Sequence, residues 1–213
     1  MAYDLQEQEQ IDELKAFWER WGNLITTLVT VAALAAAGWF GWQRWQDHRA
    51  AQAADALAQL QQAVSSKDAA RVKAALAPLV EQHAGTAQAQ MGAMLAARAQ
   101  LEAGDAAGAK AALQWAAEHA RDDAFRQLAR VGLAGVLLDE KAYDAGLQLL
   151  AGAPAGRFAG QVSDRRGDLL LAQGKRDEAR AAYRQALEQL AEGAPLREVV
   201  RLKLDALGGG AGA

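Results

Sequence analysis

Hydrophobic residues follow three different patterns along this chain. Residues 24–42 form an apolar run of 19 residues without a charged side chain. Before it, Ile11, Leu14, Trp18 and Trp21 recur at helical spacing among acids and glutamines. After it, apolar positions return every three or four residues almost to the C-terminus, which is typical of amphipathic helices. The pattern predicts an amphipathic arm over residues 1–23, one apolar helix over 24–42, an all-α domain over 43–207 and a flexible tail over 208–213.

The apolar run has the length and the flanks of a membrane span. At about 1.5 Å per residue, 19 residues reach about 28 Å, close to the hydrocarbon thickness of a bilayer. Five of the six tryptophans stand at its ends, where amphipathic rings favour the headgroup region: Trp18, Trp21, Trp39, Trp42 and Trp45. A cleaved signal peptide is one alternative, because the alanines at 35–37 resemble a cleavage site, but the preceding region is acidic instead of basic. A buried helix of a soluble protein is another. We interpret the run as an uncleaved anchor in the lipid bilayer.

The charges beside the span do not orient it. Lys15 and Arg20 precede the run, and Arg44 and Arg49 follow it. Cytoplasmic flanks usually carry the excess of basic residues, and here the two flanks tie. The residues alone therefore leave the large domain on either side of the membrane.

Two local features flank or lie within the span. The arm is predicted to be a short helix that ends at Gly22-Asn23, and it serves either as a docking segment or as a solvated lead-in to the span. Within the span, small residues recur at four-residue spacing at Ala33, Ala37 and Gly41. Such a face lets a second helix approach closely. In so alanine-rich a segment, however, chance also supplies this spacing.

Three stretches of the large domain repeat one spacing of small, turn and apolar residues. The turn positions fall at Gly104, Lys141 and Gly174, with periods of 37 and 33 residues. These periods and residue types are similar to the tetratricopeptide repeat, which has a period of about 34 residues. Small residues are needed where two helices cross, because the helix axes can approach to about 8–10 Å only if the side chains that face each other there are small. The aligned positions are Ala97, Gly104, Ala109, Leu113 and Ala116; Ala134, Leu137, Lys141, Tyr143, Gly146 and Leu150; and Gly167, Leu170, Gly174, Ala179, Tyr183 and Ala186.

The repeats predict an α-solenoid of three to four helix pairs. An irregular pair over residues 52–65 and 69–82 precedes the three better matches. A last helix carries one apolar stripe, which suits it to cover the exposed end of the stack. That stripe is formed by Leu196, Val200, Leu204 and Leu207.

In this repeat phase, the first helix of each pair lines a concave surface that we take as the candidate partner-binding groove. Its methionines and leucines suit loosely specific binding of apolar peptide, and its last unit is polar. The alternative is that these residues form the core between helices. The candidates are Met91, Met94, Arg98, Leu101, Leu128, Val131, Leu138, Gln161, Asp164, Asp168 and Leu171.

Composition removes several classes of function. The net charge is −3, of which residues 1–23 carry −4, so no basic stripe is available for nucleic acid. There is no cysteine, which excludes disulfides, thiolate chemistry and a lipid-modified N-terminal cysteine. His48, His83 and His119 are scattered, and none has a second ligand at metal-binding spacing. No nucleophile elbow or phosphate loop is present. We expect a non-catalytic protein with no cofactor, metal or small-molecule substrate.

Four segments resemble the YfgM family, the ancillary subunits of the bacterial SecYEG translocon. They are the acidic arm leading to Phe17-Trp18, and residues 41–45, 128–131 and 162–168. The resemblance covers nearly the whole chain and is weakest over residues 50–90. It implies a single-pass protein of the inner membrane with a cytoplasmic N-terminus and periplasmic repeats. It also implies association with SecYEG and with the chaperone PpiD, in handling newly exported polypeptides. No binding residue carries over. The alternative function is a cytoplasm-facing scaffold or regulator of a membrane-bound complex.

Overall fold

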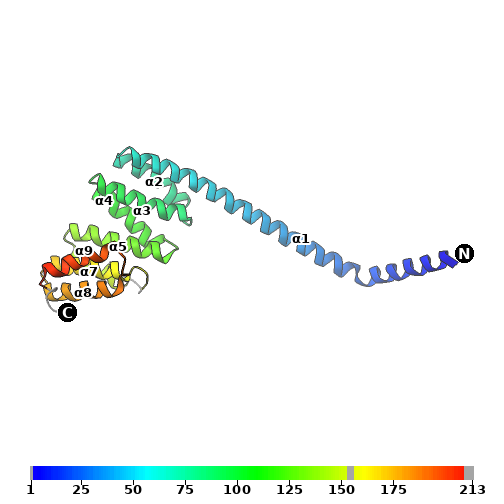
Figure 1. The fold of residues 1–213 in the computed structure, drawn as a ribbon. Coiled ribbons are helices and arrows are strands. Elements are labelled where there is room, and N and C mark those ends of the chain that lie inside the picture. The colour runs from blue at the N-terminus through cyan, green and yellow to red at the C-terminus, as the bar shows by residue number, and fades with distance from the viewer. Residues whose placement is uncertain (1, 153–155, 209–213) are drawn as a thin grey trace. The chain divides into compact units, whose positions relative to one another are not determined.

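The computed structural model describes residues 2–152 and 156–208, and the side chains of residue 15 and of those from 17 onward (Figure 1). All regular structure in this part is helical. The helices are α1 (Ala2–Ser65), α2 (Ala69–Gln82), α3 (Ala87–Glu102), α4 (Ala106–His119), α5 (Asp123–Asp139), α6 (Tyr143–Ala151), α7 (Ala159–Ala172), α8 (Arg176–Gln189) and α9 (Pro195–Ala206). The chain divides into two compact units, Met1–Ala51 and Gln52–Ala213. The predicted all-α, tetratricopeptide-like fold is confirmed; the number of repeat units stays a prediction.

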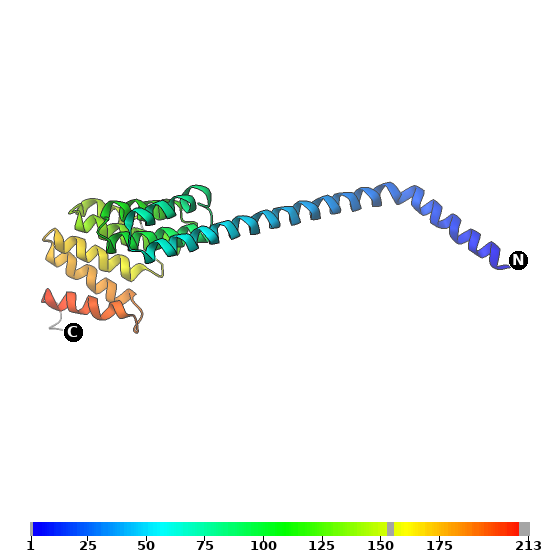
Figure 2. The same ribbon diagram turned by 90° about the horizontal axis from the view of Figure 1, so that it is seen from above.

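The arm, the span and the first helix of the repeat unit form one helix, α1, which Figure 2 shows as an unbroken ribbon. The predicted helix end at Gly22-Asn23 is therefore wrong. A single glycine inside a helix costs only about 1 kcal/mol relative to alanine, which is too little to end one. The Trp18 ring also covers Gly22, because a Cβ built there would lie 3.2 Å from the ring. The predicted arm side chains Ile11 and Leu14 lie outside the described side chains, and tail residues 209–213 lie outside the described residues.

The apolar run within α1 satisfies the requirements of a membrane span by length and composition. From residue 17 onward, α1 contains an 18-residue window with a mean hydropathy of 1.8, and none of that window is buried. The hydroxyls of Thr26, Thr27 and Thr30 each donate to the carbonyl four residues earlier, at 2.7 Å. A hydroxyl in hydrocarbon has no water to bond, so these internal bonds lower the cost of placing threonine there.

The predicted turn positions share one backbone conformation. Gly104, Lys141 and Gly174 have φ values of 79°, 61° and 79°, in the left-handed region that closes many helix C-termini. After Gly104, the Asp105 N–H donates to the Gln100 carbonyl at 2.8 Å, and equivalent bonds follow the other two turns. Lys67, with φ 55°, adopts the same backbone region in the connection between α1 and α2, which the sequence placed at residues 65–68. The three predicted turns are confirmed.

Small residues lie where the helices of each pair cross, as predicted. Ala97 and Ala134 are fully buried, and Gly167 faces Tyr183 so closely that an added Cβ would lie 2.5 Å from the ring. One core cluster contains residues from each of the helices α1 through α5, among them Leu60 and Leu79. A second cluster contains residues from α7, α8 and α9. The close approach of α7 and α8 therefore depends on the missing side chain at Gly167.

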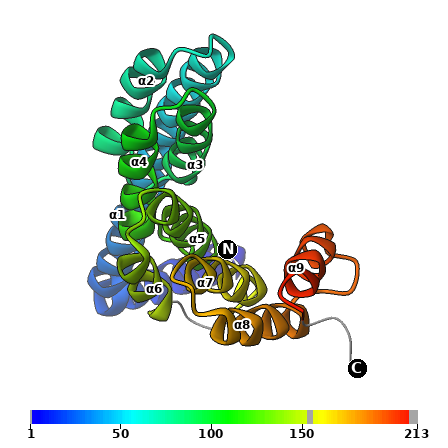
Figure 3. The same cartoon turned by 90° about the vertical axis from the view of Figure 1, so that its left-hand side faces the viewer.

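The last helix covers the end of the stack. Figure 3 shows α9 beside α8 at the end of the chain. Val200 and Leu204 of α9 and Leu207, which directly follows it, are buried and Leu196 is half-buried, all in the cluster formed with α8. The predicted capping stripe is confirmed. The irregular first pair is also present, because the end of α1 and all of α2 pack into the same core as α3.

Candidate interaction surfaces

The tryptophans and the small-residue face of the span are exposed. The five anchor tryptophans have 46–68% of their surface accessible. Trp42 and Trp45 lie 5.2 Å apart between ring centroids, and the Arg49 guanidinium lies 4.7 Å above the Trp45 ring. Ala33, Ala37 and Gly41 are exposed, and a Cβ added at Gly41 would meet nothing within 4 Å. Packing of another helix on this face stays a prediction.

The residues predicted to line the groove have different environments. Met91, Arg98, Leu101 and Leu128 are exposed. The other members are at least partly covered. Met94 packs against the core formed by helices α1 through α5, and Leu171 packs against α8 and α9. Val131 and Leu138 pack against the cluster between α5 and α7, Gln161 and Asp168 are half-buried, and Asp164 is buried. The exposed members retain the surface expected of a groove, and the covered apolar members contribute to the core. A binding role for the set stays a prediction.

The polar end of the predicted groove is filled by the capping helix. Lys203 of α9 places its ammonium 2.7 Å from a carboxylate oxygen of Asp164 and 2.7 Å from one of Asp168. The Tyr183 hydroxyl donates to Asp168 Oδ1 at 2.8 Å, and Arg165 Nη1 lies 3.3 Å from Asp168 Oδ2. Repeat phase alone did not identify Lys203 and Tyr183 as partners. The signal was a single lysine beside the apolar stripe of α9.

Burial raises the pKa of two members of this cluster, Asp164 and Tyr183. Burial raises the pKa of Asp164 above its usual value; the hydrogen bond from Lys203 opposes this effect, and the neighbouring Asp168 carboxylate adds to it. Burial, followed by the Asp168 carboxylate, raises the pKa of the Tyr183 phenol, which therefore stays a neutral donor. The cluster is a structural connection between α7, α8 and α9.

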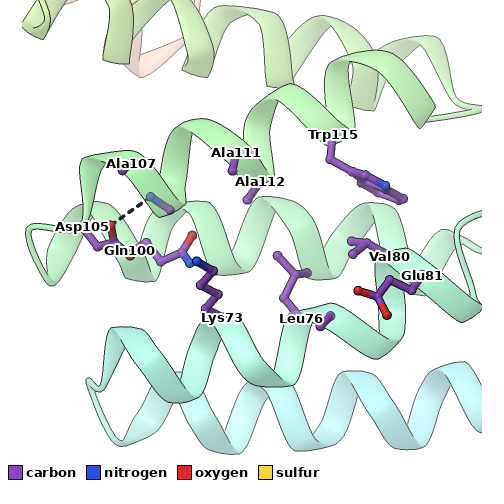
Figure 4. A pocket seen from close by; sticks show the side chains of 12 residues that line it. Lys73, Leu76, Val80, Glu81, Gln100, Asp105, Ala107, Ala111, Ala112 and Trp115 are labelled. Carbon is purple, nitrogen blue, oxygen red and sulfur yellow. Dashed lines mark hydrogen bonds between the residues drawn. The ribbon is translucent and has the colours of Figure 1, made fainter.

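A separate pocket of about 370 Å³ lies between α2 and α4 (Figure 4). Its apolar walls include Leu76, Val80 and the half-buried ring of Trp115, which stacks on His119 at 5.3 Å between centroids. The space exists because α4 presents alanines where larger residues would fill the interface. The lining residues are Lys73, Leu76, Ala77, Val80, Glu81, Gln100, Asp105, Ala107, Gly108, Ala111, Ala112 and Trp115.

The pocket has few polar groups, and they lie toward its two ends. Figure 4 shows Lys73, Gln100 and Asp105 at one end and Glu81 beside Val80 and Trp115 at the other. Asp105 Oδ1 accepts the Gly108 N–H at 2.9 Å and so caps α4. Sequence reasoning missed this pocket, because it assigned binding to the first helix of each pair. The available signal was the set of small residues over 106–112, which only Lys110 interrupts.

Comparison with known proteins gives two matches. A sequence profile described as "Tetratricopeptide repeat-like domain" matches residues 15–209. The chain is also 31% identical over 208 residues to a protein of Neisseria gonorrhoeae (strain ATCC 700825 / FA 1090) named "Ancillary SecYEG translocon subunit". That match covers 97% of this chain and 100% of the relative. No solved structure matches the chain.

Proposed function

This chain belongs to the YfgM family of ancillary SecYEG translocon subunits, and on that premise we propose that it is a non-catalytic adaptor associated with SecYEG in the bacterial inner membrane. The observation that carries the proposal is the full-length match, which includes the span as well as the repeats. Repeat stacks present extended surfaces suited to protein recognition. The exposed, tryptophan-flanked run of α1 supplies the anchor.

The proposal includes an orientation and further partners. We place the N-terminus in the cytoplasm and the repeats in the periplasm, where they act as a chaperone-like factor on newly exported polypeptides, together with the membrane-anchored chaperone PpiD. Family resemblance supports these assignments, since the flanking basic residues tie. The exposed apolar residues Met91, Leu101 and Leu128 suit contact with polypeptide that has not yet buried its own apolar surface.

Crosslinking in native membranes, followed by affinity purification of the full chain, tests the association. We expect SecYEG subunits and PpiD to be recovered with it. A matched chain in which residues 24–42 are replaced by an unrelated span of equal length separates contact through the membrane from contact through the repeats. Recovery of neither SecYEG nor PpiD with the native chain contradicts the proposal.

A topology assay tests the orientation. We expect alkaline phosphatase fused to the C-terminus to be active. Green fluorescent protein fused at the same position and exported by the same route should not fluoresce. The reverse result would place the repeats in the cytoplasm and favour the scaffold or regulator function instead. Fusions at the N-terminus should give the opposite readings and serve as the control.

A further inference from the structure

The pocket between α2 and α4 has the size and walls of a site for one large apolar side chain. Its volume of about 370 Å³ lies within the range of ligand pockets, and Leu76, Val80 and Trp115 form its apolar walls. Ala111 is exposed and lines the pocket, so its methyl group leaves the opening unobstructed. Most of the pocket lies on α2 and α4, the second helices of two neighbouring pairs, and Gln100 of α3 adds to its wall, whereas the predicted groove lies on the first helices.

The charges at its two ends differ: Lys73 shares its end with Asp105, whose carboxylate caps α4, and Glu81 lies at the other end (Figure 4). Lys73 and Glu81 both lie on α2, eight residues and therefore about 12 Å apart along the helix axis. Of the residues that line the pocket, Lys73 is the only base. Within the described part of the chain, neither Lys73 nor Glu81 forms an ion pair. A span of about 12 Å corresponds to about four residues of extended polypeptide.

One buried acceptor on the pocket wall lacks a donor. Gln100 is 1% exposed, and its Oε1 has no hydrogen-bond partner among the described residues. A buried acceptor without a donor is unfavourable, so a ligand donor that reaches this oxygen after a turn of the Gln100 amide gains by satisfying it. Peptide backbones and indole rings carry such N–H donors, and a purely hydrocarbon ligand does not.

We propose that this pocket binds an unfolded segment of a newly exported polypeptide. One large apolar side chain enters between Leu76, Val80 and Trp115, an acidic residue lies toward Lys73, and a basic residue lies toward Glu81. The proposal rests on the proposed function for the source of the polypeptide, and it names the surface that handles it. Charge complementarity selects the direction of the segment, and the apolar pocket provides affinity with little sequence specificity.

Binding of a fluorescein-labelled heptapeptide to the purified full chain in detergent micelles tests the proposal. The peptide carries a central Phe between two Leu, Asp near one end and Lys near the other. Ala111→Leu fills the pocket from an exposed position, and we expect it to weaken binding at least about tenfold, the effect of about 1.4 kcal/mol. The matched control is Ala181→Leu, at the sixth position of α8 as Ala111 is of α4, which we expect to change binding less than about twofold.

Charge reversal tests the direction. Lys73→Glu should weaken binding of the Asp-bearing peptide and favour a version in which Asp is replaced by Lys. A photoreactive phenylalanine at the central position should crosslink to residues 73–81 or 107–115. Equal binding by Ala111→Leu and Ala181→Leu, or crosslinks confined to α5, α7 or α9, would overturn the proposal.

These outcomes are distinct from failure of the proposed function. If SecYEG is recovered with the chain but pocket filling has no effect, only the pocket assignment is wrong. If peptide binding depends on the pocket but no SecYEG is recovered, the polypeptide site stands and the translocon role fails.

Discussion

At the scale of single residues, Gly167 lies so close to the fully buried ring of Tyr183 that an added Cβ would be 2.5 Å from it. We expect Gly167→Ala to lower the free energy of unfolding by about 1–2 kcal/mol, because overpacking outweighs the gain in helix propensity. Urea denaturation measures this change. The control is Gly193→Ala, whose added Cβ meets nothing within 4 Å and which should change stability by less than about 0.5 kcal/mol. Equal effects of the two substitutions would contradict the steric argument.

Asp164 gives a prediction for pH. Because its pKa is raised above 3.8 in the folded state, the fold binds this proton more tightly than the unfolded chain does. Its contribution to stability is therefore greatest at low pH and falls as pH rises from 3.8 through the raised pKa. We expect the wild-type chain to lose stability relative to Asp164→Asn over that interval, as measured by urea unfolding at several pH values. Parallel stability curves for the two proteins would contradict this.

Residue-scale prediction from the sequence succeeded where the side chain itself is the signal. Gly167 and Tyr183 stood out because a small residue and an aromatic recur at the positions where helices cross. The partners of Asp164 and Asp168 were not predicted, because Lys203 lies 39 and 35 residues further along the chain. Spacing within a helix carries no information on a contact of that range.

At the scale of elements, the hairpin turns give the sharpest test. Lys141 adopts φ 61°, a conformation that costs a residue with a Cβ about 1–2 kcal/mol. We expect Lys141→Gly to raise the free energy of unfolding by up to about 1 kcal/mol, since part of the gain is offset by the freer unfolded chain. Gly174→Ala is the reciprocal control and should lower it by about 1 kcal/mol, because Gly174 shares this conformation. Thermal unfolding of both variants checks the pair.

The elements themselves were mostly predictable, because helix period, turn residues and small crossing residues agree. The exception was the junction at Gly22-Asn23, where these two residues predicted a helix end. The helix continues through them because the residues on both sides favour helix. The pocket was also missed. A void between two helices depends on the summed volume of side chains from α2 and α4, and no single element shows it.

At the scale of the whole molecule, we expect residues 52–213 to fold without residues 1–51. The end of α1 belongs to this unit, since Leu60 is fully buried in the core that also contains Leu79. Far-UV circular dichroism and a cooperative thermal transition would check the fragment. The control fragment 66–213 lacks Leu60 and should lose at least the 2–5 kcal/mol typical of emptying one core position. Equal stability of the two fragments would contradict the assignment of 52–65 to the repeat unit.

The half-buried indole on the pocket wall has a consequence for spectroscopy. Trp115 is the only tryptophan after residue 51, so all tryptophan emission from a 52–213 fragment originates beside the pocket. An apolar occupant that displaces water from this ring should shift its emission to shorter wavelength. The protein therefore carries an intrinsic reporter of pocket occupancy, readable by titration with unlabelled peptide.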